Sequence, residues 1–306
     1  MPTISVILPC HNSQATVART IASVQAQSFA DWEMICVDDG STDETPRVLY
    51  ALAERDTRLR VIVQPNAGPS RARNVGAAEA KGAILAFLDA DDLWLPDKLA
   101  SVVAGFGDCR TDAVFGQVAF FDGETGLDHA VSAARSGPLG LEDCLGQNPL
   151  CTLSNLSVRQ DIFARTGGFD ESLRHAEDLA WLIGAVAGGA RVVGRPELHL
   201  RYRTSRDGLS ADLDAMHSGW RKAIAGVEAH LSRGVLRRAE ARHLRYLSRR
   251  ALRTGKPGST ALRLALRGLF KAPGAFLTDR HRGVATLAAC LIAPVLPETL
   301  RLRAFS

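Results

Sequence analysis

Hydrophobic positions in the first third of the chain alternate between short β-branched runs and longer segments with helical spacing. Thr3 to Pro9 (TISVILP) is typical of a buried strand, and Val17, Ile21 and Val24 then fall on one helical face. Further strands are predicted at 34–37, 59–63 and 83–88, with helices at 42–56, 70–80 and 96–106. This alternation predicts an α/β fold with a mostly parallel central sheet flanked by helices.

Beyond Asp112 the pattern is weaker. It predicts a strand over 113–121 and a polar loop at 122–149 that would cover a ligand-binding site. Helices are predicted over 156–164 and 177–187, and an edge strand over 198–202. From about residue 215 the sequence is rich in Arg, Leu and Ala at helical spacing. We therefore expect a catalytic domain over 1–214, divided at about residue 110 into two halves, and a basic helical region over 215–306.

Charge is distributed unevenly along the chain. Residues 221–306 contain 18 basic and 4 acidic side chains, a net +14, whereas residues 1–220 carry a net −10. Such asymmetry predicts an acidic catalytic body and a basic tail with a polyanionic partner. The basic amphipathic pattern of 221–253 favours an anionic membrane surface, and a helical cap packed on the catalytic domain is nearly as good an interpretation. No nucleic acid is expected, because no recognition motif is present.

Other features narrow the class of protein. The six cysteines have no CxxC spacing, which argues against a zinc site or a disulfide framework. The longest apolar run, 284–296, is interrupted by Pro294 and is too short to span a bilayer. Because the first residues lead directly into a strand pattern, we expect no signal peptide. These features predict a cytoplasmic protein. If the basic tail binds a membrane, the protein would be peripheral at the inner face of the cell membrane.

Acidic residues follow two of the predicted strands. Asp89-Ala90-Asp91-Asp92 comes after the strand at 83–88, and Asp38-Asp39 ends the strand at 34–37. Ligands of open α/β sheets bind at the carboxyl ends of the strands. The glycine-rich fingerprints of dinucleotide and P-loop sites are absent, so phosphates must be held chiefly by a cation. Carboxylates suit Mg²⁺ or Mn²⁺.

Several segments, in this order, resemble family 2 glycosyltransferases. They are Ile4 to Pro9, Val37 to Asp43 (VDDGSTD), Ala72 to Gly76 (ARNVG), Asp89 to Asp92 (DADD), Gly167 to Glu171 (GGFDE) and Glu177-Asp178. The resemblance covers residue 3 to about residue 205. It implies the GT-A fold, a nucleotide-binding half over about 1–110 and an acceptor half over about 111–214. It also implies a nucleotide-sugar donor, a divalent cation and inversion at the anomeric carbon.

The resemblance assigns residues that contact the donor. Asp39 matches the acid that hydrogen-bonds the base, usually uracil, and the adjoining Asp38 belongs to the same strand end. Pro9 and His11 match positions that shape the base pocket. Arg73 matches a residue that supports the donor.

The same resemblance assigns the metal and the catalytic base. Asp89 matches the acid near the ribose, with Ala90 beside it, and Asp91 matches the metal ligand. Asp178 matches the base that takes the proton of the acceptor hydroxyl. Taken alone, Glu177-Asp178 would suit the first turn of any helix.

The acceptor is expected to be a glycan or a lipid-linked molecule of the cell envelope. The QxxRW motif of processive members is absent, so one or a few sugars would be added. A nucleotidyltransferase on a similar sheet and a non-catalytic sugar-nucleotide binder are the alternatives. Arg201 and Arg203 could neutralise a diphosphate or remain solvated edge charges, and Trp181 is expected in the core.

Overall fold

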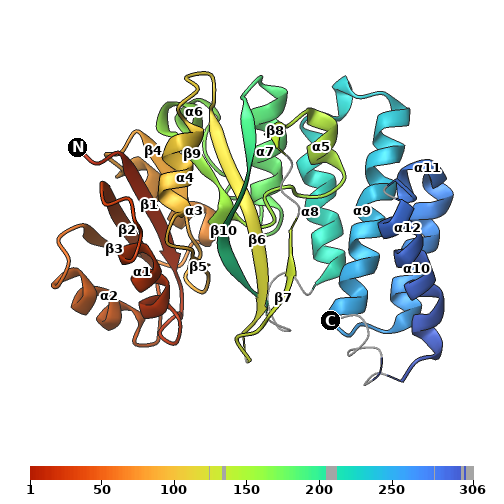
Figure 1. The fold of residues 1–306 in the computed structure, drawn as a ribbon, viewed down its shortest axis with the longest axis horizontal. Coiled ribbons are helices and arrows are strands. Elements are labelled where there is room, and N and C mark those ends of the chain that lie inside the picture. Colours follow the sequence, from red (N-terminus) through yellow and green to blue (C-terminus); the bar gives the residue numbers. More distant parts are fainter. Residues whose placement is uncertain (124, 133–135, 205–211, 279, 298–299, 301–306) are drawn as a thin grey trace. The chain divides into compact units, whose positions relative to one another are not determined.

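The computed structural model describes residues 1–123, 125–132, 136–204, 212–278, 280–297 and residue 300. The chain forms two compact units. The first comprises Met1–Leu139 and Leu150–Ser205, and the second comprises Gly140–Pro149 and Arg206–Ser306. The first unit contains the β-sheet, and the described part of the second is helical (Figure 1).

The beginning of the first unit alternates between strands and helices, as predicted. The elements are β1 (Ile4–Cys10), α1 (Val17–Gln25), β2 (Trp32–Asp39), α2 (Thr45–Ala53), β3 (Leu59–Gln64), α3 (Pro69–Ala78), β4 (Ile84–Phe87), β5 (Leu93–Trp94) and α4 (Lys98–Gly105). Strands β3, β2, β1 and β4 are neighbours in that order and pair in parallel. Their carboxyl ends therefore meet at one edge of the sheet.

Helices cover both faces of these strands. Ile4, Val6 and Leu8 of β1 are completely buried in a core that α1, α2 and α4 complete. On the opposite face α3 packs through Gly76, where an added Cβ would lie 2.6 Å from Cγ2 of Ile7. A larger residue would force α3 away from the sheet. Gly76 therefore sets the position of the helix that carries Arg73.

The rest of the first unit extends the sheet. Its elements are β6 (Ala113–Asp122), β7 (Asp128–Val131), β8 (Gly137–Pro138), the 3₁₀ turn η1 (Leu153–Asn155), β9 (Ser157–Arg159), α6 (Gln160–Arg165), α7 (Glu177–Ala187) and β10 (Val192–Thr204). The full strand order is β3-β2-β1-β4-β9-β6-β10-β5, with β7 on β6 and β8 on β10. The parallel β6–β10 pair and the antiparallel pairs of β9 make the sheet mixed.

Three predictions for this part need correction. The helix expected over 156–164 is wrong in its first half, because Ser157–Arg159 form β9 between β4 and β6. The strand expected over 198–202 is part of the longer β10 and lies between β6 and β5, so it is not an edge strand. The segment expected as a loop, 122–149, contains two short strands and a helix in its described residues.

The second unit is built from α5 (Leu141–Leu145), α8 (Leu213–Ala225), the 3₁₀ turn η3 (Glu228–His230), α9 (Arg233–Arg253), α10 (Gly258–Lys271), α11 (Pro273–Phe276), α12 (Arg280–Ile292) and the 3₁₀ turn η4 (Ala293–Val295). Its core includes Leu244, Leu247 and Phe276. The indole N–H of Trp220 donates to the carbonyl of Leu145 at 2.8 Å, which ties α5 to α8. In the part of the chain that the structure describes, no helix is long and apolar enough to cross a membrane.

Candidate active site

The sheet brings two predicted acidic segments to the same edge. Cys10 lies opposite Asp38 at the ends of β1 and β2, and Ile7 pairs with Phe87 just before the segment that begins at Asp89. Ligands of such sheets bind in the crevice at the carboxyl ends of the strands.

The Asp39 carboxylate accepts hydrogen bonds from two backbone N–H groups and one side-chain amide. Its Oδ1 accepts from the backbone N–H of Ala67 at 2.9 Å and from the Gln64 amide at 2.7 Å. Its Oδ2 accepts from the backbone N–H of Gly68 at 2.8 Å. The Asp39 carbonyl lies 2.9 Å from Nδ1 of the exposed His11 ring. The pairing fixes Asp39 and His11 side by side at the end of β2.

Asp38 has a different environment. Its side chain is buried, and its Oδ2 accepts from the backbone N–H of Ser41 at 3.3 Å. Its Oδ1 has no hydrogen-bond partner among the described residues. A buried acceptor without a partner is uncommon. Pro9 precedes the end of β1 on the neighbouring strand.

Arg73 links the strand-end acids to α7. Its Nη2 donates to Oδ1 of Asp89 at 2.6 Å, and its Nη1 donates to Oε1 of Glu177 at 3.1 Å. Burial alone would lower the pKa of this guanidinium, but Asp89, Glu177 and Asp178 raise it above its ordinary value. Paired on both sides, the buried cation is compensated. Arg73 on α3 therefore holds the acidic turn that follows β4 and the start of α7 in one arrangement.

Asp91 is the exposed member of the acidic turn. Partial desolvation and the neighbouring Asp89 carboxylate raise its pKa to about 6, and the Arg203 guanidinium opposes that rise. Arg203 is held by the turn itself, since its Nε donates to the Asp91 carbonyl at 3.0 Å. Ala90 contributes its carbonyl, which accepts from the Thr20 hydroxyl at 3.0 Å. Asp91 is therefore an exposed carboxylate on a turn whose backbone is anchored on two sides.

The last acid of the turn, Asp92, is completely buried. Its Oδ1 accepts from the backbone N–H of Arg203 at 2.9 Å. Burial raises the pKa of Asp92, as do the charges of Asp91 and Asp89. Lys98 on α4 is also fully buried, which lowers its pKa, while Asp92 opposes that shift. Asp92 thus supports the turn from beneath and does not face the crevice.

Asp178 lies in the first turn of α7, a helix whose bounds match the prediction. Its Oδ1 accepts from the backbone N–H of Leu179 at 2.7 Å. Burial raises the pKa of Asp178 to about 7, and the negative charges of Glu177 and Asp89 add to that rise. Arg73 lowers it. A carboxylate with a pKa near neutrality is suited to accept a proton during a reaction.

The segment before α7 is attached to both α3 and β4. Asn74 donates to the Phe169 carbonyl at 2.8 Å and accepts from the Phe169 N–H at 2.9 Å. The Phe169 ring packs edge-on against Phe87, with ring centroids 5.0 Å apart, and it contacts Phe163 and Trp181. The burial of Trp181 confirms the prediction that it lies in the core. These contacts fix α7 beside the acidic turn.

A metal at this site would need ligands from the substrate. Among the described residues no group of three or more His, Cys, Asp and Glu side chains lies close enough to hold a metal ion. Asp91 nevertheless suits Mg²⁺ or Mn²⁺, which are commonly bound by one or two carboxylates together with water and substrate phosphates. An exposed carboxylate on an anchored turn is consistent with such a shared site.

The structure brings Asp89, Arg73 and Asp178 into one electrostatic cluster. Two members of the site were not assigned from the sequence. The sequence indicates Glu177 only as the neighbour of Asp178, and for Arg203 it does not distinguish a phosphate ligand from a solvated charge. Arg201 pairs with Asp128 at 2.8 Å, so that arginine is engaged away from the acidic turn.

Comparison with known proteins identifies related sequences. A model of glycosyl transferase family 2 matches residues 5–167. The succinoglycan biosynthesis protein ExoO of Rhizobium meliloti is 32% identical over 255 residues, 77% of this chain and 70% of that protein. The putative teichuronic acid biosynthesis glycosyltransferase TuaG of Bacillus subtilis is 32% identical over 215 residues, 69% of this chain and 82% of that protein. An uncharacterized Nostoc glycosyltransferase is 40% identical over 142 residues, 46% of this chain and 43% of that protein.

Solved structures share the fold. The mannosyltransferase PcManGT of Pyrobaculum calidifontis, in complex with GDP-Man and Mn²⁺, superposes with a TM-score of 0.63 at 20% identity, covering 99% of this chain and 87% of that one. S. aureus TarS 1-349 in complex with UDP-GlcNAc superposes with a TM-score of 0.58 at 16% identity, covering 95% of this chain and 90% of that one. At these identities the likeness concerns the arrangement of the backbone.

Proposed function

The chain belongs to glycosyl transferase family 2 and is a glycosyltransferase, and from this premise we propose a metal-dependent reaction that inverts the anomeric carbon. The donor is a nucleotide diphosphate sugar, most simply a UDP-sugar, and the acceptor is a hydroxyl group of an envelope glycan or glycolipid. The observation that carries the proposal is the cluster in which Arg73 joins Asp89 of the acidic turn to α7, the helix that carries Asp178.

The donor base is proposed to bind at the ends of β1 and β2. Among the residues that the structure describes, only the Gly68 N–H donates to Oδ2 of Asp39, so this oxygen retains a lone pair for an N–H of the base. His11 beside it, with Pro9 on the adjacent strand, would form the wall against which the base rests. Backbone N–H groups hold the Asp39 carboxylate in place before the donor arrives, which reduces the entropy lost on binding.

The diphosphate is proposed to meet the acidic turn. Asp91 would bind Mg²⁺ or Mn²⁺, and the cation, when bound, stabilises the charge that accumulates on the leaving diphosphate. Asp89, held by Arg73, would accept a hydrogen bond from the ribose. The guanidinium of Arg203 lies close enough to Asp91 to influence its pKa, and it would supply further positive charge beside the phosphates.

Asp178 is proposed as the general base. The acceptor oxygen attacks the anomeric carbon from the side opposite the diphosphate, and its proton passes to Asp178 as the new C–O bond forms. The bond from the anomeric carbon to the β-phosphate oxygen breaks, and that oxygen leaves with the electron pair. One displacement at one carbon gives inversion. A pKa of about 7 leaves a substantial fraction of Asp178 ionised at neutral pH.

The acceptor class is proposed from the relatives. The names of ExoO and TuaG refer to succinoglycan biosynthesis and teichuronic acid biosynthesis. We infer an acceptor of the same general kind, either a glycan or its lipid-linked precursor. An enzyme with a lipid-linked acceptor would work at the inner face of a membrane.

The direct test is the exchange Asp178→Asn. Wild type should release UDP from at least one UDP-sugar in the presence of Mn²⁺ and an acceptor panel of lipid-linked sugars. We expect D178N to lose roughly 10²- to 10⁴-fold in turnover, as is typical when a general base is removed. Binding of UDP should persist. D161N, an exposed aspartate on α6, is the matched control. Undiminished turnover in D178N would exclude Asp178 as the base.

A further inference from the structure

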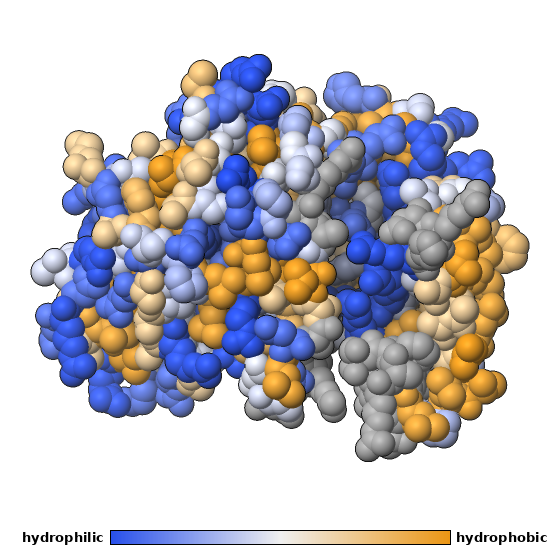
Figure 2. Space-filling model, in the orientation of Figure 1, coloured by the Kyte–Doolittle hydropathy of each residue, from blue (hydrophilic) through white to orange (hydrophobic). Residues whose placement is uncertain are grey.

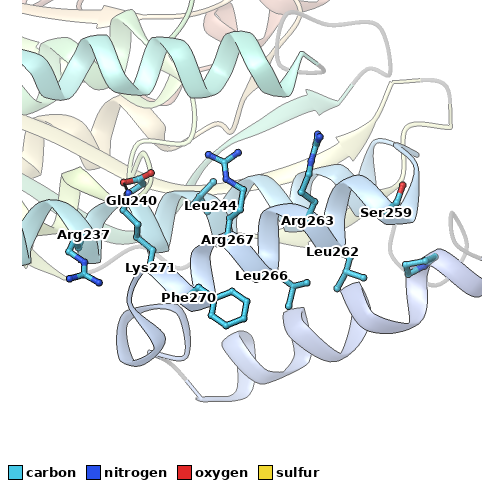
Figure 3. Close-up of a pocket in the computed structure, with 11 residues that line it drawn as sticks. Arg237, Glu240, Leu244, Ser259, Leu262, Arg263, Leu266, Arg267, Phe270 and Lys271 are labelled. Carbon is cyan, nitrogen blue, oxygen red and sulfur yellow. Dashed lines mark ion pairs between the residues drawn. The ribbon is translucent and has the colours of Figure 1, made fainter.

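Helix α10 in the second unit carries two parallel rows of side chains. The basic row is Arg263, Arg267 and Lys271, and the apolar row is Leu262, Leu266 and Phe270. Within each row the residues are four apart, so each row follows one face of the helix. Figure 3 shows the arginines of the basic row extending to one side of α10 while the apolar row lies along another.

A groove of about 770 Å³ runs along this helix, lined by residues of α9, α10 and η4. Arg237 of α9 adds a fourth cation to the basic row, and among the described lining residues Glu240 is the one carboxylate. Glu240 forms an ion pair with Lys271. Among the described residues no salt bridge is formed by Arg237, Arg263 or Arg267, so three exposed guanidinium groups are available to an anion.

Apolar side chains are unusually exposed in the same unit. Phe270 is 79% exposed and Val295 is 80% exposed. Val284, Leu291, Ile292 and Leu300 are each more than half exposed. Figure 2 shows hydrophobic surface gathered over the carboxy-terminal helices. Single exposed hydrophobic residues are ordinary, but several in one short stretch mark an interaction surface.

We propose that this face of α10, with the adjoining η4, docks on an anionic phospholipid membrane. Arginine forms paired hydrogen bonds with phosphate, and the basic row would bind the phosphates of the headgroups. Phe270 and Val295 would enter the outer part of the acyl region. Charge complementarity argues for a membrane of anionic lipid, because an uncharged surface would leave three guanidinium groups without partners. This inference extends the proposed lipid-linked acceptor, since docking would bring the enzyme to it.

Vesicle flotation with the full chain tests the proposal without donor or metal. Wild type should float with phosphatidylcholine vesicles that contain phosphatidylglycerol, and high salt should release it. R263Q/R267Q should weaken binding by roughly thirtyfold, because each basic residue near an anionic leaflet contributes a factor of roughly five. F270A should weaken it by roughly tenfold. The control R19Q/R55Q removes two exposed arginines of the first unit and should bind as wild type.

The proposal is overturned if R263Q/R267Q and F270A float as wild type does, or if the control loses as much as R263Q/R267Q. It is also overturned if a short DNA duplex binds wild type more tightly than the vesicles and R263Q/R267Q abolishes that binding. Thermal melting and UDP binding with Mn²⁺ should be unchanged in all variants, which shows that the fold is intact. Failure of wild type to bind UDP would instead count against the proposed catalysis and leave the membrane result standing.

Discussion

At the scale of single residues, the site contains carboxylates whose surroundings give them different properties. The Asp39 carboxylate accepts hydrogen bonds from two backbone N–H groups, which hold it in place. Asp178 is desolvated beside Glu177, and its pKa rises to about 7. Asp91 is exposed on an anchored turn. Asp39 is therefore suited to accept a hydrogen bond, Asp178 to act as a base and Asp91 to bind a cation.

The pKa of Asp178 predicts a pH profile. A base acts in its ionised form, so kcat/KM should be low below pH 7 and should rise as pH increases through about 7. E177Q removes the nearest negative charge and leaves Arg73 free to act on Asp178, so the rise should move to lower pH. Steady-state rates between acidic and alkaline pH give both curves. An unmoved profile in E177Q would show that another group controls the rate.

We expect a large loss of stability when the charge of Arg73 is removed. Arg73→Met would leave Asp89 and Glu177 without their shared cation, and we expect the free energy of unfolding to fall by about 3 kcal/mol. Arg71 on the same helix pairs with Glu171 at the surface, and Arg71→Met should cost less than about 1 kcal/mol. Urea denaturation measures both. Equal losses of unfolding free energy in the two variants would contradict the role of Arg73 as the shared partner of Asp89 and Glu177.

At the scale of elements, the site depends on how α3 and α7 are held against the sheet. Gly76 allows α3 to approach β1, and Asn74 binds the backbone of Phe169 ahead of α7. The aromatic contacts of Phe169 with Phe87 tie the same segment to β4. Displacement of either helix would separate Arg73 from one of its carboxylate partners.

The amino-terminal strands and helices could be predicted because their hydrophobic periodicity is local. Strand β9 could not, since three residues are too few to show alternation and they run directly into α6. The strand-end acids can be predicted from the sequence because they directly follow apolar runs. The bridge between Arg73 and Glu177 joins residues 104 apart in the sequence, and no local pattern signals such a contact.

We expect that replacing Ala176, the residue before α7, by glycine stabilises the protein. It has a left-handed backbone with φ of 63°, which costs a residue with a Cβ about 1 kcal/mol. Ala176→Gly should therefore raise the free energy of unfolding by about that amount. Ala180→Gly, within α7, should lower it by about 1 kcal/mol because glycine destabilises a helix interior. Urea denaturation should give opposite signs for the two exchanges, and a loss in both would show that Ala176 is not strained.

At the scale of the whole molecule, the two units differ in charge and in exposed apolar surface, and we propose a different role for each. The first unit contains the acidic strand ends proposed to bind the donor and the cation. The second contains the exposed arginines and hydrophobic residues proposed to meet a membrane. The net charges of residues 1–220 and 221–306 have opposite signs, which is consistent with this division.

Isothermal titration calorimetry with UDP tests the central claim most directly, namely that Asp91 holds a divalent ion that binds the diphosphate. Wild type should bind UDP at least roughly tenfold more tightly with Mn²⁺ than with EDTA, because a cation held by Asp91 would offset the negative charge of the diphosphate. D91N with Mn²⁺ should bind as weakly as wild type with EDTA. Equal UDP affinity for wild type and D91N, with Mn²⁺ present, would contradict the claim.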